Sequence, residues 1–147
     1  MRSLRSFQVL LFLLALFVTV AGTMNVLFGT VPLPGDTSVS PVVDSNYRFF
    51  SAIFLAMGIM LLWIVPRPLE RDRSLALRWV CGAVLLGGLS RILSLFVAGI
   101  PAPLSFFLMG MELVVPPVLF LWHRSLSSRS VGPAAPAENG GPEGVLS

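Results

Sequence analysis

The sequence has no lysine, and it has one cysteine, one histidine and one tyrosine among its 147 residues. A single cysteine, Cys81, excludes an internal disulfide and any metal site built from several cysteines. Cys81 lies in an apolar run, so we interpret it as a small buried side chain. The lone His123 has no second candidate ligand near it in the sequence, and we therefore predict no metal site and no cofactor.

Charge is also scarce. Charged residues make up 12% of the chain, about half of the roughly 25% typical of soluble domains. Hydrophobic residues make up 55%, and the mean hydropathy is +0.87. The net charge of +3 comes from ten arginines, but it does not indicate nucleic acid, because eight of them flank apolar segments, as cytoplasmic loops of membrane proteins require. The partner that this composition implies is a lipid bilayer.

Four apolar stretches are each long enough to cross that bilayer. We predict an all-α, polytopic membrane protein in which one domain, 1–124, forms a four-transmembrane-helix bundle with spans at 7–28, 46–65, 75–98 and 103–122. The first span could instead be a cleaved signal peptide, but its apolar character continues beyond Ala21-Gly22, which favours a retained helix. Residues 125–147 are rich in Ser, Pro, Ala and Gly and predict a disordered cytoplasmic tail.

Flanking residues predict the orientation. The arginine-rich segments before the first span, between the second and third, and after the fourth all fall on one side, which is the cytoplasmic side. Trp63, Trp79 and Trp122 fall at the same boundary, where an aromatic belt is expected. Residues 30–45 form the outer loop, with Asp44 or Ser45 as the N-cap of the next helix. We therefore predict a multi-pass protein of the plasma (cell inner) membrane with both termini cytoplasmic.

Two charged residues lie well inside the last two spans. Arg91 precedes Pro101, in the short turn between these spans, by ten residues, and Glu112 follows it by eleven. At about 1.5 Å per residue, both lie roughly 15 Å from the turn. In an antiparallel pair they are therefore at matching depth, and pairing would relieve the cost of two lone charges in a membrane. The pair predicts either a structural latch or a ligand or proton site.

Other polar residues of the spans also fall in the outer half. We predict a pocket there formed by Arg48, Arg91, Glu112, Asn46, Tyr47, Asn25 and Ser94. Two arginines near one glutamate would favour a small anionic or lipid-like ligand. Arg48 could instead extend to the outer headgroups, and Tyr47 could be an interfacial anchor.

Small residues predict which face of the third span carries Arg91 inward. Ala83, Gly87, Arg91 and Ser94 recur at helical spacing, and small residues let helices approach closely in a bilayer. In the fourth span, Ser105, Met109, Glu112 and Pro116 share a face.

These residues resemble a known family. The sequence Asn46-Tyr47-Arg48, the Gly-Gly-Leu-Ser that precedes Arg91, and Gly-Met-Glu112-Leu are similar to the polar positions of a widespread bacterial family catalogued as domain of unknown function 4345. The resemblance extends from Phe7 to Trp122. It implies a four-helix membrane bundle and carries no activity, substrate or cofactor. Small multidrug exporters also have four helices, but their essential glutamate lies in the first span, which has no acidic residue here.

The sequence contains no catalytic set. The sole histidine lies away from the polar pocket, and there is no Gly-rich phosphate loop or metal-ligand spacing. Our leading prediction is a non-enzymatic membrane protein that binds a small anionic or lipid-like ligand, or a membrane-protein partner, at an outward-facing pocket. The alternatives are a structural or accessory subunit of a membrane complex, and a membrane enzyme acting on a lipid or quinone.

Overall fold

The computed structural model describes residues 2–30, 39–100 and 103–130. They form four helices, α1 (Arg2–Phe28), α2 (Pro41–Ile64), α3 (Arg71–Ala98) and α4 (Pro103–Ser130), and no strand. Each helix is long and apolar enough to cross a membrane, with mean hydropathies of 2.3, 1.8, 2.0 and 2.0 over the candidate spans. The predicted all-α membrane fold with four helices is confirmed, and its environment is a lipid bilayer.

The helices extend beyond the predicted spans. Helix α1 begins at Arg2 rather than Phe7. Helix α2 begins at Pro41 rather than Asn46, because Ser40 is the N-cap, with its hydroxyl accepting a hydrogen bond from the Val43 amide at 3.4 Å. Proline suits the first helical position, since its missing N–H would have no partner there. Helix α3 begins at Arg71, before the predicted start. Helix α4 runs past the predicted end of the domain to Ser130, and the rest of the tail, 131–147, lies outside the described residues.

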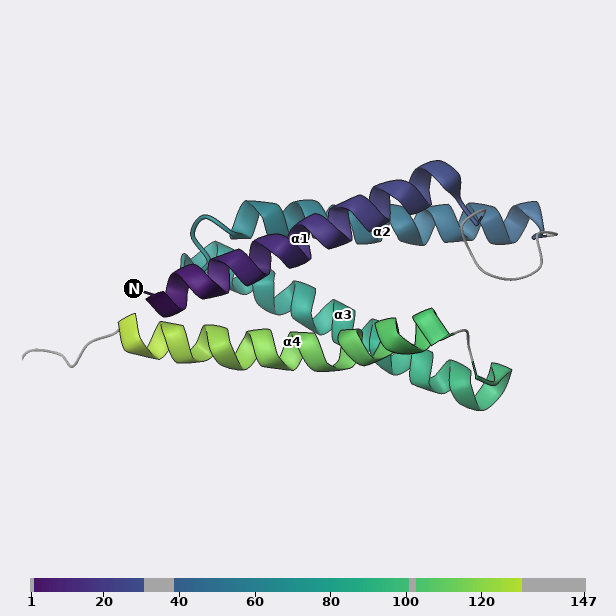
Figure 1. Ribbon diagram of the computed structural model, residues 1–147. Helices are drawn as coiled ribbons and strands as arrows, with labels where there is room; N and C mark the ends of the chain where they lie inside the picture. Colours follow the sequence, from purple (N-terminus) through teal and green to yellow (C-terminus); the bar gives the residue numbers. More distant parts are fainter. Residues whose placement is uncertain (1, 31–38, 101–102, 131–147) are drawn as a thin grey trace, which may run out of the picture.

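The helices form two antiparallel pairs (Figure 1). We call α1 and α2 the first hairpin and α3 and α4 the second hairpin. The hairpins meet at the end that holds the N-terminus and the α2–α3 link, and they diverge toward the other end. We call these the closed end and the open end. The bundle is therefore wedge-shaped, with tight packing within each hairpin and little packing between them at the open end.

Glycines bring the two helices of the first hairpin together. A Cβ atom at Gly22 would lie 2.8 Å from the Cα atom of Leu55, and one at Gly58 would lie 2.6 Å from the Thr19 hydroxyl. Both distances are too short for real carbon atoms. The backbones of α1 and α2 are thus nearly in contact, which is how membrane helices gain packing energy without a hydrophobic effect between them.

In the second hairpin, the close contact is made by Gly88. A Cβ atom there would lie 3.0 Å from the Leu113 side chain and 3.1 Å from the Glu112 Cβ. Gly87 has open space around it and Ala83 is exposed, so the predicted stripe of small residues does not face α4. The contact face is rotated by one residue, about 100° around the helix. Arg91 still reaches α4 because its side chain is long.

The closed end carries the buried core. Phe7, Leu11, Ile64 and Leu77 are almost fully buried there, and so is His123, with 2% of its surface exposed. The Phe7 and Trp122 rings pack edge to face with centroids 5.5 Å apart. These side chains come from all four helices, so the hairpins are joined mainly at this end.

Hydrogen bonds to the α2–α3 link stabilise the same junction. The His123 Nε2 atom lies 2.9 Å from the Pro68 carbonyl oxygen and 3.2 Å from the Ser74 hydroxyl. The Gln8 amide donates to the carbonyls of Val65 and Pro66, each at 3.1 Å. His123 therefore has a structural role at the junction of α4 with the link.

His123→Ala should lower the free energy of unfolding by about 2 kcal/mol. The substitution removes a buried ring and leaves the Pro68 carbonyl without this partner, and each loss is unfavourable in a packed core. Arg124→Ala, at the exposed neighbouring position, is the control. The measurement is chemical unfolding in detergent micelles followed by circular dichroism, and equal stability of the two variants would contradict a junction held by His123.

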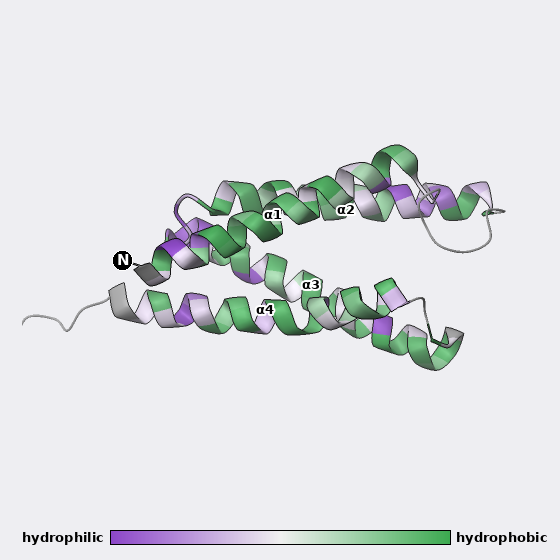
Figure 2. Cartoon of the chain, viewed as in Figure 1, coloured by the Kyte–Doolittle hydropathy of each residue, from purple (hydrophilic) through white to green (hydrophobic). Residues whose placement is uncertain are grey.

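The distribution of hydrophobic and hydrophilic residues follows the arrangement of the helices (Figure 2). Hydrophobic residues cover the middle of each helix, and hydrophilic residues gather at the closed end and at the open end of the first hairpin. At the closed end the Arg73 guanidinium lies 4.8 Å from the centre of the Trp63 ring. A polar residue within the middle or open half of the second hairpin is therefore an exception that requires an explanation.

Candidate functional site

Arg91 and Glu112 form an ion pair between α3 and α4. The Arg91 Nε and Glu112 Oε2 atoms are 2.7 Å apart, with 45% of the arginine side chain and 20% of the glutamate side chain exposed. The predicted pairing at matching depth is confirmed. It follows from the equal distances of the two residues from the turn, which an antiparallel hairpin converts into spatial contact.

The Arg91 and Glu112 side chains are close together but are not well aligned for a hydrogen bond. Glu112 Oε2 is buried and accepts no hydrogen bond of good geometry from any residue that the structure describes. The Arg91 N–H is therefore near the carboxylate but not directed at it, although directed bonds between charged groups are the strong ones. At Oε2 the contact between the two residues is therefore an attraction of opposite charges rather than a directed hydrogen bond.

A cavity of about 270 Å³ lies beside Glu112, between the hairpins. We call it the apolar cavity, because its walls are hydrophobic and Glu112 is the only charged residue among the described residues that line it. All four helices contribute to its lining, with Leu14, Phe17 and Val18 from α1, Phe54 and Leu61 from α2, Val80, Cys81 and Val84 from α3, and Phe107, Leu108, Met111, Glu112, Val115, Pro116 and Leu119 from α4.

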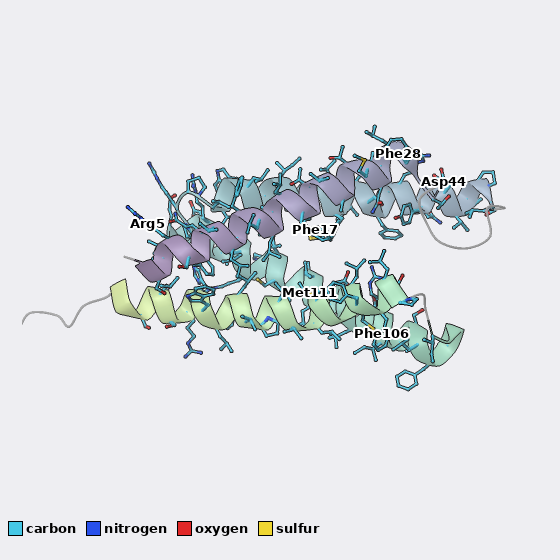
Figure 3. The ribbon with its side chains drawn as sticks, in the orientation of Figure 1. Arg5, Phe17, Phe28, Asp44, Phe106 and Met111 are labelled. Carbon is cyan, nitrogen blue, oxygen red and sulfur yellow. The ribbon has the colours of Figure 1, made fainter. Side chains whose placement is uncertain are left out.

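The apolar cavity reaches the protein surface. Phe17, Phe107 and Met111 line it and are themselves exposed. In Figure 3, Phe17 of α1 and Met111 of α4 face each other across the space between the hairpins. Because the surrounding surface is apolar, this opening faces the lipid rather than water.

A second, smaller cavity of about 60 Å³ lies within the second hairpin and is lined by Arg91, Ser94, Leu95, Ser105 and Met109. We call it the polar cavity. Arg91 lines the polar cavity and Glu112 lines the apolar one, so the ion pair connects the two. Ser94 was predicted for the site, and Ser105 was recognised only as sharing a helix face with Glu112.

Pro116 places a further polar group beside the apolar cavity. Proline has no N–H to donate to the carbonyl four residues earlier, which here is the carbonyl of Glu112. Pro116 is buried and lines the cavity. The backbone carbonyl of Glu112 is therefore left without its usual helical donor close to the ion pair.

The contacts given for Arg48 do not include Arg91 or Glu112. Its Nε atom is 2.7 Å from the Asp44 carboxylate, and its Nη1 atom donates to the carbonyls of Val26 and Leu27 at 2.8 and 3.0 Å. Asp44 in turn accepts a hydrogen bond from the Thr30 amide at 2.9 Å. Every contact described for Arg48 thus stays within the first hairpin, where it caps the end of α1, and the structure does not bring Arg48 to Glu112.

The remaining predicted residues are spread over the first hairpin. Tyr47 of α2 is half-buried and lies within electrostatic range of Arg91 of α3. Asn46 is exposed. Asn25 is half-buried, and its carbonyl accepts a hydrogen bond from the Gly29 amide at 2.9 Å where α1 ends. Of the seven predicted residues, the structure places Arg91, Glu112 and Ser94 at the cavities and Tyr47 near Arg91.

The chain can be compared with known protein families and structures. The sequence profile of a family described as Domain of unknown function (DUF4345) matches residues 6–123. The chain belongs to the DUF4345 family. No curated protein and no solved structure matches it.

The matched range contains the whole of the site. Both cavities and the ion pair lie in the DUF4345 domain. Within residues 2–30, 39–100 and 103–130, no group of three or more His, Cys, Asp and Glu residues could hold a metal ion. What this DUF4345 domain offers is an apolar volume with one charged pair at its edge, an arrangement suited to binding an amphiphilic molecule.

Proposed function

We propose that this protein binds a lipid-like molecule between its hairpins, with the apolar part of the molecule in the apolar cavity and its polar part at the Arg91–Glu112 pair. One observation carries the proposal: the four helices share an apolar cavity in which the only charged lining group belongs to a membrane ion pair. Charged residues inside membrane spans are rare and mark functional sites by default. Ligand sites in general combine apolar walls with a few placed polar groups.

The orientation is part of the proposal. Arginines at the closed end, including Arg5, Arg67 and Arg78, are exposed, and an excess of arginine marks the cytoplasmic side. The closed end would then face the cytoplasm, with both termini there. The opening between Phe17 and Met111 would admit molecules from within the bilayer.

Native mass spectrometry of gently extracted protein tests this function. We expect the wild type to retain a defined small mass, and the Arg91→Met/Glu112→Met double variant, which removes both charges together, to lose it. Arg78→Met, an exposed arginine on the same helix, is the matched control and should retain it. If wild type and double variant carry the same bulk lipid, the ligand proposal is wrong.

A second candidate function rests on the packing beside the pair. Gly88 brings α3 into close contact with Glu112 itself, so the pair also fixes the register of the second hairpin. Buried ion pairs can serve only to specify packing. The protein would then be a structural or accessory subunit, and the mass spectrum would show the same protein partner on wild type and double variant.

A further inference from the structure

The polar cavity supplies donors for a negatively charged group. The Arg91 guanidinium carries five N–H donors and no acceptor, and the hydroxyls of Ser94 and Ser105 can each donate one more hydrogen bond. The cavity volume of about 60 Å³ is several times the ~10–15 Å³ needed for one water. It therefore has room for a small oxyanion, whose oxygens match the guanidinium fork.

Arg91 is free to change partners. Its side chain is nearly half exposed, and its contact with Glu112 lacks a directed hydrogen bond. An oxyanion in the polar cavity could accept two parallel N–H bonds from the guanidinium, which is a stronger arrangement than the existing contact. The existing pair is thus the weaker of two arrangements that Arg91 can adopt.

We propose that the polar cavity is the headgroup subsite for an anionic, single-chain amphiphile, whose head competes with the Glu112 carboxylate for Arg91. The chain of the amphiphile lies in the apolar cavity, so this inference rests on the proposed function. The volume of about 270 Å³ is just below the ~300–1,000 Å³ of typical ligand pockets, which suits one alkyl chain better than two.

Photocrosslinking of the full chain in phosphatidylcholine nanodiscs tests the inference. The probe is an alkyl sulfonate with a diazirine near the end of its chain, and the matched control is the alcohol with the same chain. We expect the sulfonate to label lining residues of the apolar cavity about tenfold more than the alcohol, because hydrogen bonds to charged groups are the stronger kind.

Two variants test the contributions of Arg91 and Glu112 separately. Arg91→Met should remove the preference for the sulfonate and leave labelling by the alcohol. Glu112→Gln removes the charge that competes with the anion for Arg91, so sulfonate labelling should be at least as strong as in the wild type. Arg78→Met is the control that keeps the wild-type pattern.

The outcomes distinguish this inference from the proposed function. Equal labelling of the cavity by sulfonate and alcohol would overturn the headgroup subsite and leave the lipid-binding function standing. Labelling of the cavity by neither probe would overturn both. Protection by methanesulfonate at the same concentration as the long-chain sulfonate would show a site for a free anion and contradict an amphiphile. Weaker sulfonate labelling in Glu112→Gln than in the wild type would contradict competition between the anion and Glu112 for Arg91.

Discussion

Replacing Arg91 alone with methionine is expected to lower the free energy of unfolding by about 2.5–3.5 kcal/mol, the insertion cost of a lone charge at the centre of a membrane helix. The variant leaves Glu112 without its cation beside an apolar cavity. Glu112→Met should be similarly costly, because it leaves Arg91 unpaired. The measurement is reversible unfolding in mixed micelles, followed by circular dichroism.

The double variant is the decisive comparison. Replacing both members of a buried pair by apolar residues is often neutral or stabilising, whereas removing one is strongly unfavourable. Arg91→Met/Glu112→Met should therefore be more stable than either single variant. If the two single costs simply add in the double variant, the two charges do not interact and the pair is not a functional unit.

Gly58→Ala is expected to destabilise the first hairpin by about 3 kcal/mol. The added Cβ would lie 2.6 Å from the Thr19 hydroxyl oxygen and 2.7 Å from the Thr19 backbone nitrogen. Backbone atoms cannot move aside as a flexible side chain can, so the helices must separate, and overpacking of this kind is costly. The measurement is the same unfolding transition.

Gly87→Ala is the matched control. Gly87 has nothing within 4 Å of an added Cβ, and alanine is the better helix former by about 1 kcal/mol. We expect this variant to be as stable as the wild type or slightly more so. Similar destabilisation at Gly58 and Gly87 would mean that the contact between α1 and α2 is not set by their glycines.

Much of the fold could be predicted from the sequence because each span carries its own signal. Apolar length determines the four helices, and equal distance from the turn determines that Arg91 meets Glu112. The predicted start of α2 was wrong, because the N-cap is Ser40 and not Asp44 or Ser45. Asp44 is instead used by Arg48 and Thr30, a tertiary arrangement that no local pattern displays.

The site was only partly predictable for a physical reason. The sequence predicts well how far along a helix a residue lies. It predicts poorly on which side of the helix that residue lies, because apolar residues occur on every face of a membrane helix. That is why the contact glycine is Gly88 rather than Gly87. The apolar cavity results from the divergence of two hairpins, and residues such as Phe54 and Val84 carry no mark that would assign them to it.

The wedge shape has a mechanical consequence. The hairpins pack against each other near Phe7 and His123. They diverge toward the open end along helices that are about 36–42 Å long. A rotation of one hairpin by only about 5° about the closed end would move its far end by about 3 Å over such a length. A small change in the packing around Phe7 and His123 would therefore change the width of the opening between Phe17 and Met111.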